Sequence, residues 1–222
     1  MAKREDAVAS SGDLPQVLPV FPLAGAILLP HASRPFNIFE PRYLNMIDDA
    51  MAAERIIGLV QPAMGMAANP PERPFLAQVG CAGRITAFTE TSDGRYLITL
   101  TGVSRFRLGE ELPAATPYRR VRADFDAFAA DLQPLPGVED DRETLLGPLR
   151  RYLEPRDLTI EWDLAENAPI GPLINSLAMA LPFDPAEQQA LLEAPTPDER
   201  RRMLIALLRI DGPFGDDPPS LQ

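Results

Sequence analysis

The sequence predicts an α+β protein in which a β-rich N-terminal part, built around one short helix, precedes a helical C-terminal part. Two observations predict this class. Apolar and polar residues alternate on both sides of Asp93-Gly94, as in a β-hairpin whose tight turn needs the positive φ that glycine adopts freely. Beyond about residue 131 the apolar spacing becomes that of helices.

The β elements follow from this alternation. The first hairpin strand has apolar residues at the odd positions Val79, Cys81, Ile85 and Ala87, and the second at the even positions Tyr96, Ile98, Leu100, Phe106 and Leu108. Thr99, Thr101, Arg105 and Arg107 are therefore expected on the opposite, wetter face. Further strands are predicted at 16–21, 26–29, 36–39, 55–61 and 119–128.

The helices are marked by their start signals. Pro41 follows Glu40 and opens a helix to about Ala53, because proline is tolerated at the first helical position. Asp184 and Thr196 are each followed by proline and, three residues on, by glutamate, which is the capping-box pattern. We expect helices at 138–153, bent or broken near Gly147-Pro148, and at 169–181, 184–193 and 196–210.

Composition changes along the chain as well. Up to Arg122 there are 13 basic and 12 acidic residues, and after it 8 and 20, so the negative charge belongs to the C-terminal part. With a proline-rich linker at 133–137, these features predict a disordered tail at 1–13, a β subdomain at 14–132, a helical subdomain at 133–210 and an acidic tail at 211–222.

Reactive residue types are scarce. The 222 residues include one lysine (Lys3), one histidine (His31) and one cysteine (Cys81). A serine-lysine dyad, a phosphate-loop lysine, a zinc cage of thiols or imidazoles and an intrachain disulfide are therefore all excluded within this sequence. We expect no catalytic residues, no metal and no cofactor. The polar start and the short apolar run at 17–30 predict a cytoplasmic protein without a membrane segment.

Two segments favour binding. The loop 61–74 contains Met64 and Met66, and flexible thioethers can adapt to varied apolar partners, although they can equally cap the core. The segment 19–43 is rich in Phe21, Leu28, Leu29, Phe36 and Phe39 but is interrupted by prolines. Part of it is expected to line an apolar groove, with the core as the alternative place for most of these side chains. Cys81 is expected to be a small buried hydrophobe.

Several motifs together resemble a known family. They are Leu18-Pro19-Val20-Phe21-Pro22-Leu23, Leu29-Pro30-His31, Pro35-Phe36-Asn37-Ile38-Phe39-Glu40-Pro41-Arg42-Tyr43, Ile57-Gly58-Leu59-Val60-Gln61, Val79-Gly80-Cys81-Ala82-Gly83-Arg84-Ile85, Gly102-Val103-Ser104-Arg105-Phe106-Arg107 and Leu177-Ala178-Met179-Ala180-Leu181-Pro182-Phe183. This set resembles the N-terminal, substrate-binding domain of the ATP-dependent Lon protease, and most of all its short stand-alone bacterial relatives. The resemblance covers about 14–210.

The resemblance implies a PUA-like β pseudo-barrel followed by a helical subdomain. In Lon this region is associated with recognising unfolded or tagged polypeptides, whereas hydrolysis belongs to ATPase and serine-lysine protease modules that this sequence lacks. We therefore expect a non-catalytic peptide-binding module, an adaptor or chaperone-like factor, whose partners are unfolded or tagged polypeptides. Whether it acts beside a separate protease stays open. The candidate peptide-binding residues are His31, Phe36, Phe39, Arg42, Tyr43, Met64 and Met66.

Two rival functions remain. PUA-like barrels can bind RNA, and seven arginines around the hairpin could form a phosphate-facing stripe, namely Arg84, Arg95, Arg105, Arg107, Arg119, Arg120 and Arg122. The acidic second half argues against nucleic acid. A hydrolase using His31 or Ser104 is the least favoured interpretation, because no reaction constellation surrounds either residue in the sequence.

Overall fold

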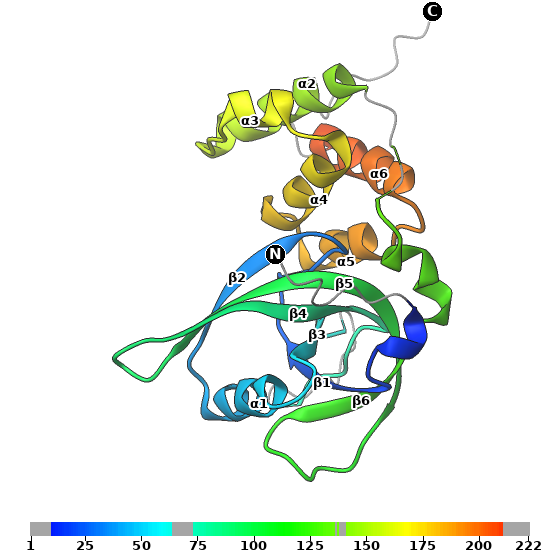
Figure 1. Ribbon diagram of the computed structural model, residues 1–222. Helices are drawn as coiled ribbons and strands as arrows, with labels where there is room; N and C mark the ends of the chain where they lie inside the picture. Colours follow the sequence, from blue (N-terminus) through cyan, green and yellow to red (C-terminus); the bar gives the residue numbers. More distant parts are fainter. Residues whose placement is uncertain (1–9, 64–72, 136, 138–140, 211–222) are drawn as a thin grey trace, which may run out of the picture. The chain divides into compact units, whose positions relative to one another are not determined.

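A closed ring of β-strands forms the N-terminal part of the computed structural model, which describes residues 10–63, 73–135, 137 and 141–210. The sheet order is β2-β5-β4-β3-β1-β6, and an additional β5–β6 pairing closes five of the strands into a pseudo-barrel (Figure 1). The strands are β1 (Val17–Pro22), β2 (Ser33–Ile38), β3 (Ile56–Val60), β4 (Val79–Glu90), β5 (Tyr96–Glu111) and β6 (Arg119–Asp124).

β5 is the strand that makes closure possible. Its 16 residues pair with β4 along most of their length, with β2 toward the hairpin turn and with β6 toward the other end. All pairings of the named strands are antiparallel except β1 with β3, which is parallel. Phe106 of β5 lies completely buried inside the ring, against Leu18, Val20 and Val121.

The expected hairpin is confirmed, with Gly94 at φ 78° in the turn between β4 and β5. The strict alternation fails because the register shifts between Ala82 and Gly83 and again between Ile85 and Ala87. As a result, β4 is buried at five consecutive positions from Val79, and Ala87 is exposed.

One predicted strand is wrong. Residues 26–29 are buried but belong to no strand, and the chain there runs between Gly25, which has φ 69°, and Pro30. This segment passes so close to β5 that a Cβ on Gly102 would lie 2.1 Å from the carbonyl oxygen of Leu29. Glycine at 102 is therefore required by the close approach of two backbones.

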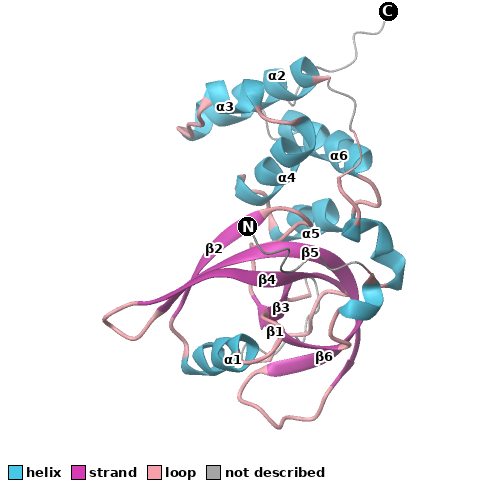
Figure 2. Cartoon of the chain, in the orientation of Figure 1, coloured by secondary structure: helices cyan, strands magenta, loops and turns pink. Residues whose placement is uncertain are grey.

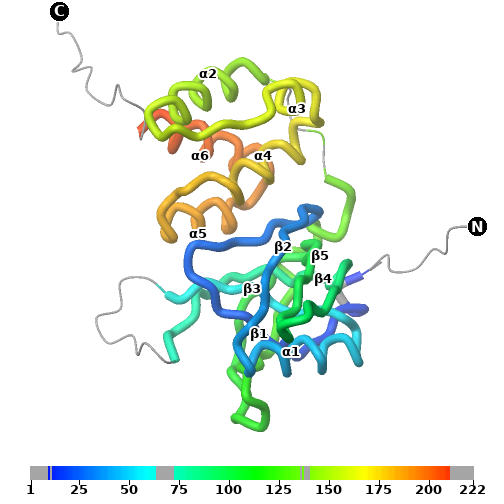
Figure 3. Tube along the Cα trace, turned by 90° about the vertical axis from the view of Figure 1, so that its left-hand side faces the viewer, coloured from blue at the N-terminus to red at the C-terminus, as the bar shows by residue number. Residues whose placement is uncertain are grey.

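α1 (Pro41–Met51) crosses from β2 to β3 and begins at Pro41, as the sequence predicts. Its buried residues are Tyr43, Met46, Ile47 and Ala50, and the helix lies next to β1 (Figure 3). A short 3-10 helix, η1 (Ser11–Asp13), precedes β1. Another, η2 (Asp126–Leu132), follows β6 where the sequence predicted a longer strand to residue 128.

The helices of the C-terminal part are α2 (Arg142–Leu153), η3 (Glu154–Arg156), α3 (Trp162–Asn167), α4 (Ile170–Ala180), α5 (Pro185–Glu193) and α6 (Pro197–Ile210) (Figure 2). Both expected start signals form their glutamate contact, and at Thr196 the reciprocal bond from the Glu199 backbone N–H to the Thr196 hydroxyl forms as well. The Glu187 carboxylate accepts from the Asp184 backbone N–H at 2.8 Å, and Glu199 accepts from that of Thr196 at 3.1 Å. The predicted α+β class with a helical C-terminal part is confirmed.

α2 is not broken at Gly147-Pro148. The helix contains Pro148 and continues to Leu153, with Leu145, Leu149 and Tyr152 completely buried along one side. Packing of this face stabilises the helix beyond the one intrahelical hydrogen bond that proline removes. α3 was missed, because a six-residue helix is too short to show a clear period.

Contacts divide the described residues into two units, the first within Met1–Leu135 and Pro182–Leu192 and the second within Pro136–Leu181 and Glu193–Gln222. The sequence predicted a single boundary, after residue 132, between the β subdomain and the helical subdomain. In the structure, α5 belongs to the same unit as the β-barrel. The side-chain amide of Gln61, just after β3, donates to the carbonyl oxygen of Pro185 at 2.9 Å, and that of Gln189 donates to the carbonyl oxygen of Val79 at 3.0 Å. In the second unit Arg200 donates to the Asn175 side chain at 3.1 Å, and both are buried.

Candidate functional site

Two adjoining hollows lie at one end of the barrel, where β1 and β3 end and where β6 and α1 begin. The first has a volume of about 160 Å³ and is lined by Pro22, Arg42, Tyr43, Pro62, Pro74, Pro117, Tyr118 and Arg119. The second has a volume of about 190 Å³ and is lined by Arg42, Arg73, Glu111, Leu112, Ala114, Thr116, Pro117, Tyr118 and Arg119. Because they share four lining residues, we treat them together as the Arg42 hollow.

Prolines at strand ends build the walls of the first hollow. Pro22 is the last residue of β1, Pro62 follows β3, and Pro117 precedes β6. Pro74 lies directly before Phe75, whose side chain is half exposed. Since proline has no N–H, these four residues present apolar rings and no backbone donor of their own. The rings of Tyr43 and Tyr118 add aromatic surface to these proline walls.

The charged groups of the hollow are arranged in two sets. Arg119 donates to both carboxylate oxygens of Glu111, at 2.9 and 2.7 Å, and to the carbonyl oxygen of Pro74 at 2.6 Å. Arg73 donates to the same carboxylate at 2.7 Å. Arg42 donates to Glu40 at 2.9 Å through Nε, and its guanidinium lies 4.6 Å from the centre of the Tyr43 ring.

These surroundings change the pKa values of three lining groups. The hydrogen bond from Arg119 lowers the pKa of Glu111, so this carboxylate is ionised at neutral pH. Burial, followed by the hydrogen bond to Asp49 at 2.6 Å, raises the pKa of Tyr118 to about 12. Burial also raises the pKa of Tyr43. Both tyrosines therefore keep their hydroxyl protons at neutral pH.

Several of the predicted peptide-binding residues lie together. The Phe21 ring packs edge-on against Phe36 at 5.9 Å and against Tyr43 at 4.7 Å between ring centres. Tyr43 in turn lines the hollow beside Arg42. Phe39, directly before Glu40 at the start of α1, is 62% exposed. Met64 and Met66 lie outside the described residues.

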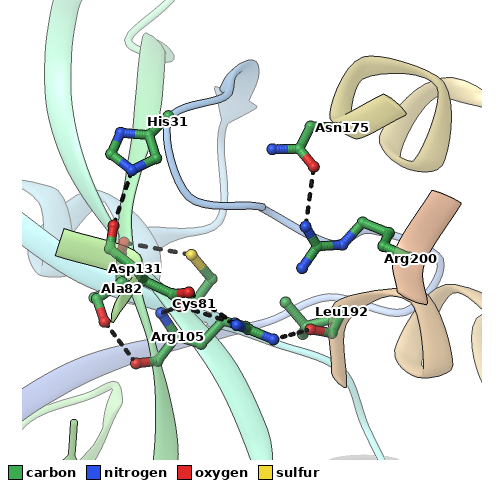
Figure 4. Close-up of polar contacts among 9 residues, drawn as sticks. His31, Cys81, Ala82, Arg105, Asp131, Asn175, Leu192 and Arg200 are labelled. Carbon is green, nitrogen blue, oxygen red and sulfur yellow. Dashed lines mark hydrogen bonds and ion pairs between the residues drawn. The ribbon is translucent and has the colours of Figure 1, made fainter. Parts of the chain in front are cut away.

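His31 lies elsewhere, at the opposite end of β2 from Phe39. It has φ 63°, is exposed, and donates from Nε2 to the carbonyl oxygen of Asp131 at 2.8 Å (Figure 4). Its backbone N–H donates to the carbonyl oxygen of Gly102 at 2.9 Å. The structure therefore gives His31 a local role in joining the β2 entry to η2.

Arg105 was predicted to lie on the wetter face of the hairpin, and this prediction is wrong. Its side chain is 4% exposed and forms a bidentate ion pair with Asp131, with Nε to Oδ2 and Nη2 to Oδ1 both at 2.8 Å (Figure 4). Its Nη1 donates to the carbonyl oxygen of Leu192 at the end of α5, and its guanidinium lies 4.7 Å from the Phe128 ring centre. Arg105 therefore joins β5, η2 and α5.

Four of the seven arginines named for the RNA-binding alternative are engaged with carboxylates. Arg105 is buried, and Arg95, Arg119 and Arg122 form ion pairs with Asp93, Glu111 and Glu110. Ser104, named for the hydrolase alternative, is completely buried and donates to the carbonyl oxygen of Arg105. Cys81 is completely buried, as expected.

Tyr118 was not predicted from the sequence as a site residue, and Arg119 was named there only for the arginine stripe of the RNA-binding alternative. A signal was present, because Pro117-Tyr118-Arg119 repeats the composition of Pro41-Arg42-Tyr43, a proline followed by adjacent arginine and tyrosine. Among the described residues no group of three or more His, Cys, Asp or Glu side chains could hold a metal ion. In the same part of the chain no helix is long and apolar enough to cross a membrane.

Comparison with known proteins identifies the family. The family model for the ATP-dependent protease La (LON) substrate-binding domain matches residues 17–209. The chain belongs to this family. Its membership supports a substrate-binding role, and the match covers both the barrel and the helices of this Lon substrate-binding domain.

Individual relatives agree with this assignment. Lon protease 2 of Sorangium cellulosum is 25% identical over 197 residues, which are 86% of this chain and 24% of that protein. Lon protease of Roseiflexus castenholzii is 24% identical over 204 residues, 88% of this chain and 24% of that protein. The chain thus spans about a quarter of the length of these two proteases.

Two solved structures are similar along most of the chain. The crystal structure of a Lon N-terminal domain protein from Xanthomonas campestris has a TM-score of 0.59 and 25% identity, and the match covers 86% of this chain and 97% of that one. The N-terminal domain of Mycobacterium avium complex Lon protease has a TM-score of 0.57 at 19% identity, with the same coverages. The second likeness shows the shared fold.

Proposed function

We propose that this Lon substrate-binding domain holds apolar segments of unfolded polypeptides without cleaving them, as an adaptor or chaperone-like factor. The observation that carries the proposal is that exposed aromatic side chains lie close, along the chain, to residues that line the proline-walled Arg42 hollow. Phe39 precedes α1 directly, Phe75 adjoins Pro74, and both are more than half exposed. Exposed large apolar side chains that gather near a concave site are typical of interaction surfaces.

The residue types that line the described part of the Arg42 hollow favour binding over catalysis. The described polar groups of the Arg42 hollow are arginines, tyrosines, a threonine and one carboxylate, and that carboxylate is engaged by two arginines. Nucleophilic catalysis needs an activated nucleophile beside a general base. His31, the one histidine of the sequence, lies at the other end of β2.

The test is a titration with a permanently unfolded protein. Fluorescein-labelled α-lactalbumin, reduced and carbamidomethylated so that its cysteines carry no charge, should bind saturably by fluorescence anisotropy, and the native form should not. Mass spectrometry after overnight incubation should find the unfolded protein intact. No saturation at 100 μM of this chain, or cleavage of the probe, would overturn the proposal.

A pair of variants locates the surface. Phe39→Ser removes an apolar side chain that is 62% exposed, and Leu164→Ser removes one that is 64% exposed on α3. Neither change affects the core, so both variants should fold and show the same circular dichroism. Phe39→Ser should weaken binding about fivefold or more, since burying such a side chain contributes about 1.5–3 kcal/mol, whereas Leu164→Ser should leave it unchanged. Equal effects would contradict the assigned surface.

A further inference from the structure

The Arg42 hollow carries positive charge on a chain that is strongly negative. Three arginines and one glutamate line it, while the formal net charge of the whole sequence is −11. A concave site with an excess of one sign of charge among its lining residues attracts ligands of the opposite sign. The group best suited to this hollow is therefore an anion attached to an apolar body.

Arg42 is the guanidinium available to such an anion. Arg119 is 18% exposed, and it donates to both oxygens of Glu111 and to the carbonyl oxygen of Pro74. Arg42, by contrast, is 46% exposed and pairs, among the described residues, with Glu40, which is 43% exposed and lies two residues away. Ion pairs between solvent-exposed side chains contribute little to stability, so an incoming anion can take the place of Glu40.

The chemistry of the site favours a carboxylate over a phosphate. A planar guanidinium matches the two oxygens of a carboxylate, and the Tyr43 ring beneath Arg42 holds the guanidinium in place. Glu111, which is ionised, lines the second hollow and would repel a dianion more than a monoanion. The first hollow, where the prolines and Tyr43 lie, has a volume of about 160 Å³, well below the roughly 300–1,000 Å³ of a drug-sized ligand site, and so suits the side chain of a single residue.

We propose that the Arg42 hollow captures the C-terminal residue of a polypeptide, with its α-carboxylate on Arg42 and its apolar side chain against the four prolines and Tyr43. A chain end can enter a small hollow alone, whereas an internal residue brings a flanking segment on each side. Capture of a terminal carboxylate is a recurrent mode of peptide recognition. This inference rests on the proposed function and names the part of a polypeptide that is recognised.

The test compares three fluorescein-labelled decapeptides by anisotropy. The first ends in Ala-Leu with a free carboxylate, the second is its C-terminal amide, and the third is the amide with one internal glutamate. The free acid should bind about tenfold more tightly than either amide, because hydrogen bonds to a charged group are stronger than those to a neutral one. Equal affinities for acid and amide would overturn the inference, and tighter binding of the glutamate peptide would assign the hollow to acidic side chains instead.

Three variants separate recognition from damage to the fold. Arg42→Gln should bring the acid peptide down to the affinity of the amide. Glu40→Gln removes the competing carboxylate and should tighten binding of the acid about twofold or threefold, which a damaged fold would not produce. Arg150→Gln is the matched control, because Arg150 lies 4.6 Å from the Trp162 ring centre and donates to Glu166 at 2.9 Å, with 59% exposure.

Different results would contradict the capture of a chain end and the binding of unfolded polypeptides. If unfolded α-lactalbumin binds but acid and amide peptides do not differ, the function stands and the chain-end inference is wrong. A loss in Arg150→Gln equal to that in Arg42→Gln would show a general charge effect and also overturn it. So would competition by a uridine oligonucleotide that displaces the acid peptide, since the Arg42 hollow would then belong to nucleic acid.

Discussion

Replacing Asp131 with alanine should destabilise the barrel strongly. The carboxylate accepts three hydrogen bonds from Arg105, from the backbone N–H at 3.0 Å and from Nε and Nη2 at 2.8 Å. Their side chains are 5% and 10% exposed, so the variant leaves a guanidinium buried without its counterion. Removing one partner of a buried ion pair costs about 3–5 kcal/mol, a large share of the roughly 5–15 kcal/mol that a typical protein has.

The assay is urea unfolding followed by far-ultraviolet circular dichroism, because Trp162, the one tryptophan, lies in the second unit. Asp131→Asn keeps the shape and one acceptor, so its loss should be smaller than that of Asp131→Ala. The double variant Arg105→Met with Asp131→Leu should recover most of the stability, because an apolar pair of similar volume avoids the desolvation of two charges. A loss below about 1 kcal/mol in Asp131→Ala would refute the argument that this pair is desolvated.

Four further predictions follow from single contacts. Gly102→Ala should lower the free energy of unfolding by about 3 kcal/mol or more, since its Cβ would lie 2.1 Å from a backbone oxygen; a denaturant midpoint equal to that of the wild type would contradict this. Thr196→Ala, which removes the α6 cap, should cost about 1 kcal/mol in thermal unfolding. The hydrogen bond from Arg119 lowers the pKa of Glu111 below its ordinary 4.5, so the stability advantage of the wild type over Glu111→Gln should be full above pH 4.5 and should shrink as the pH falls through the lowered value. In an absorbance titration at 295 nm, Tyr118 should ionise near pH 12, and Tyr118→Phe should remove that step.

The turns and helix starts that were predicted correctly are those whose contacts join residues close together in the sequence. The Asp93-Gly94 turn and the caps at Asp184 and Thr196 involve residues within four positions of one another, and each forms as expected. The even positions of β5 are buried from Ile98 to Phe106 as predicted, but Arg105 on the opposite face is buried too, because its partners Asp131 of η2 and Leu192 of α5 come from 26 and 87 residues further along the chain. Nothing in the neighbourhood of Arg105 in the sequence indicates that pairing.

The same distinction applies to the candidate site. Arg42 and Tyr43 were named because they lie in one recognisable motif at the start of α1. Tyr118 and Arg119 are about 75 positions away, and the pairing of β6 with β1 brings them to the same hollow. The roles of Phe36, Phe39 and His31 in binding remain predictions.

The placement of α5 has a consequence for synthesis on the ribosome. The barrel strands are complete at Asp124, yet Gln61, Val79 and Arg105 acquire hydrogen-bond partners from residues 185–192 only after the intervening helices have emerged. Until then, these three polar groups must be satisfied by water or by a chaperone. The nascent barrel should therefore stay protease-sensitive until about residue 192 has left the exit tunnel. A chain that ends at residue 135 should never become protease-resistant.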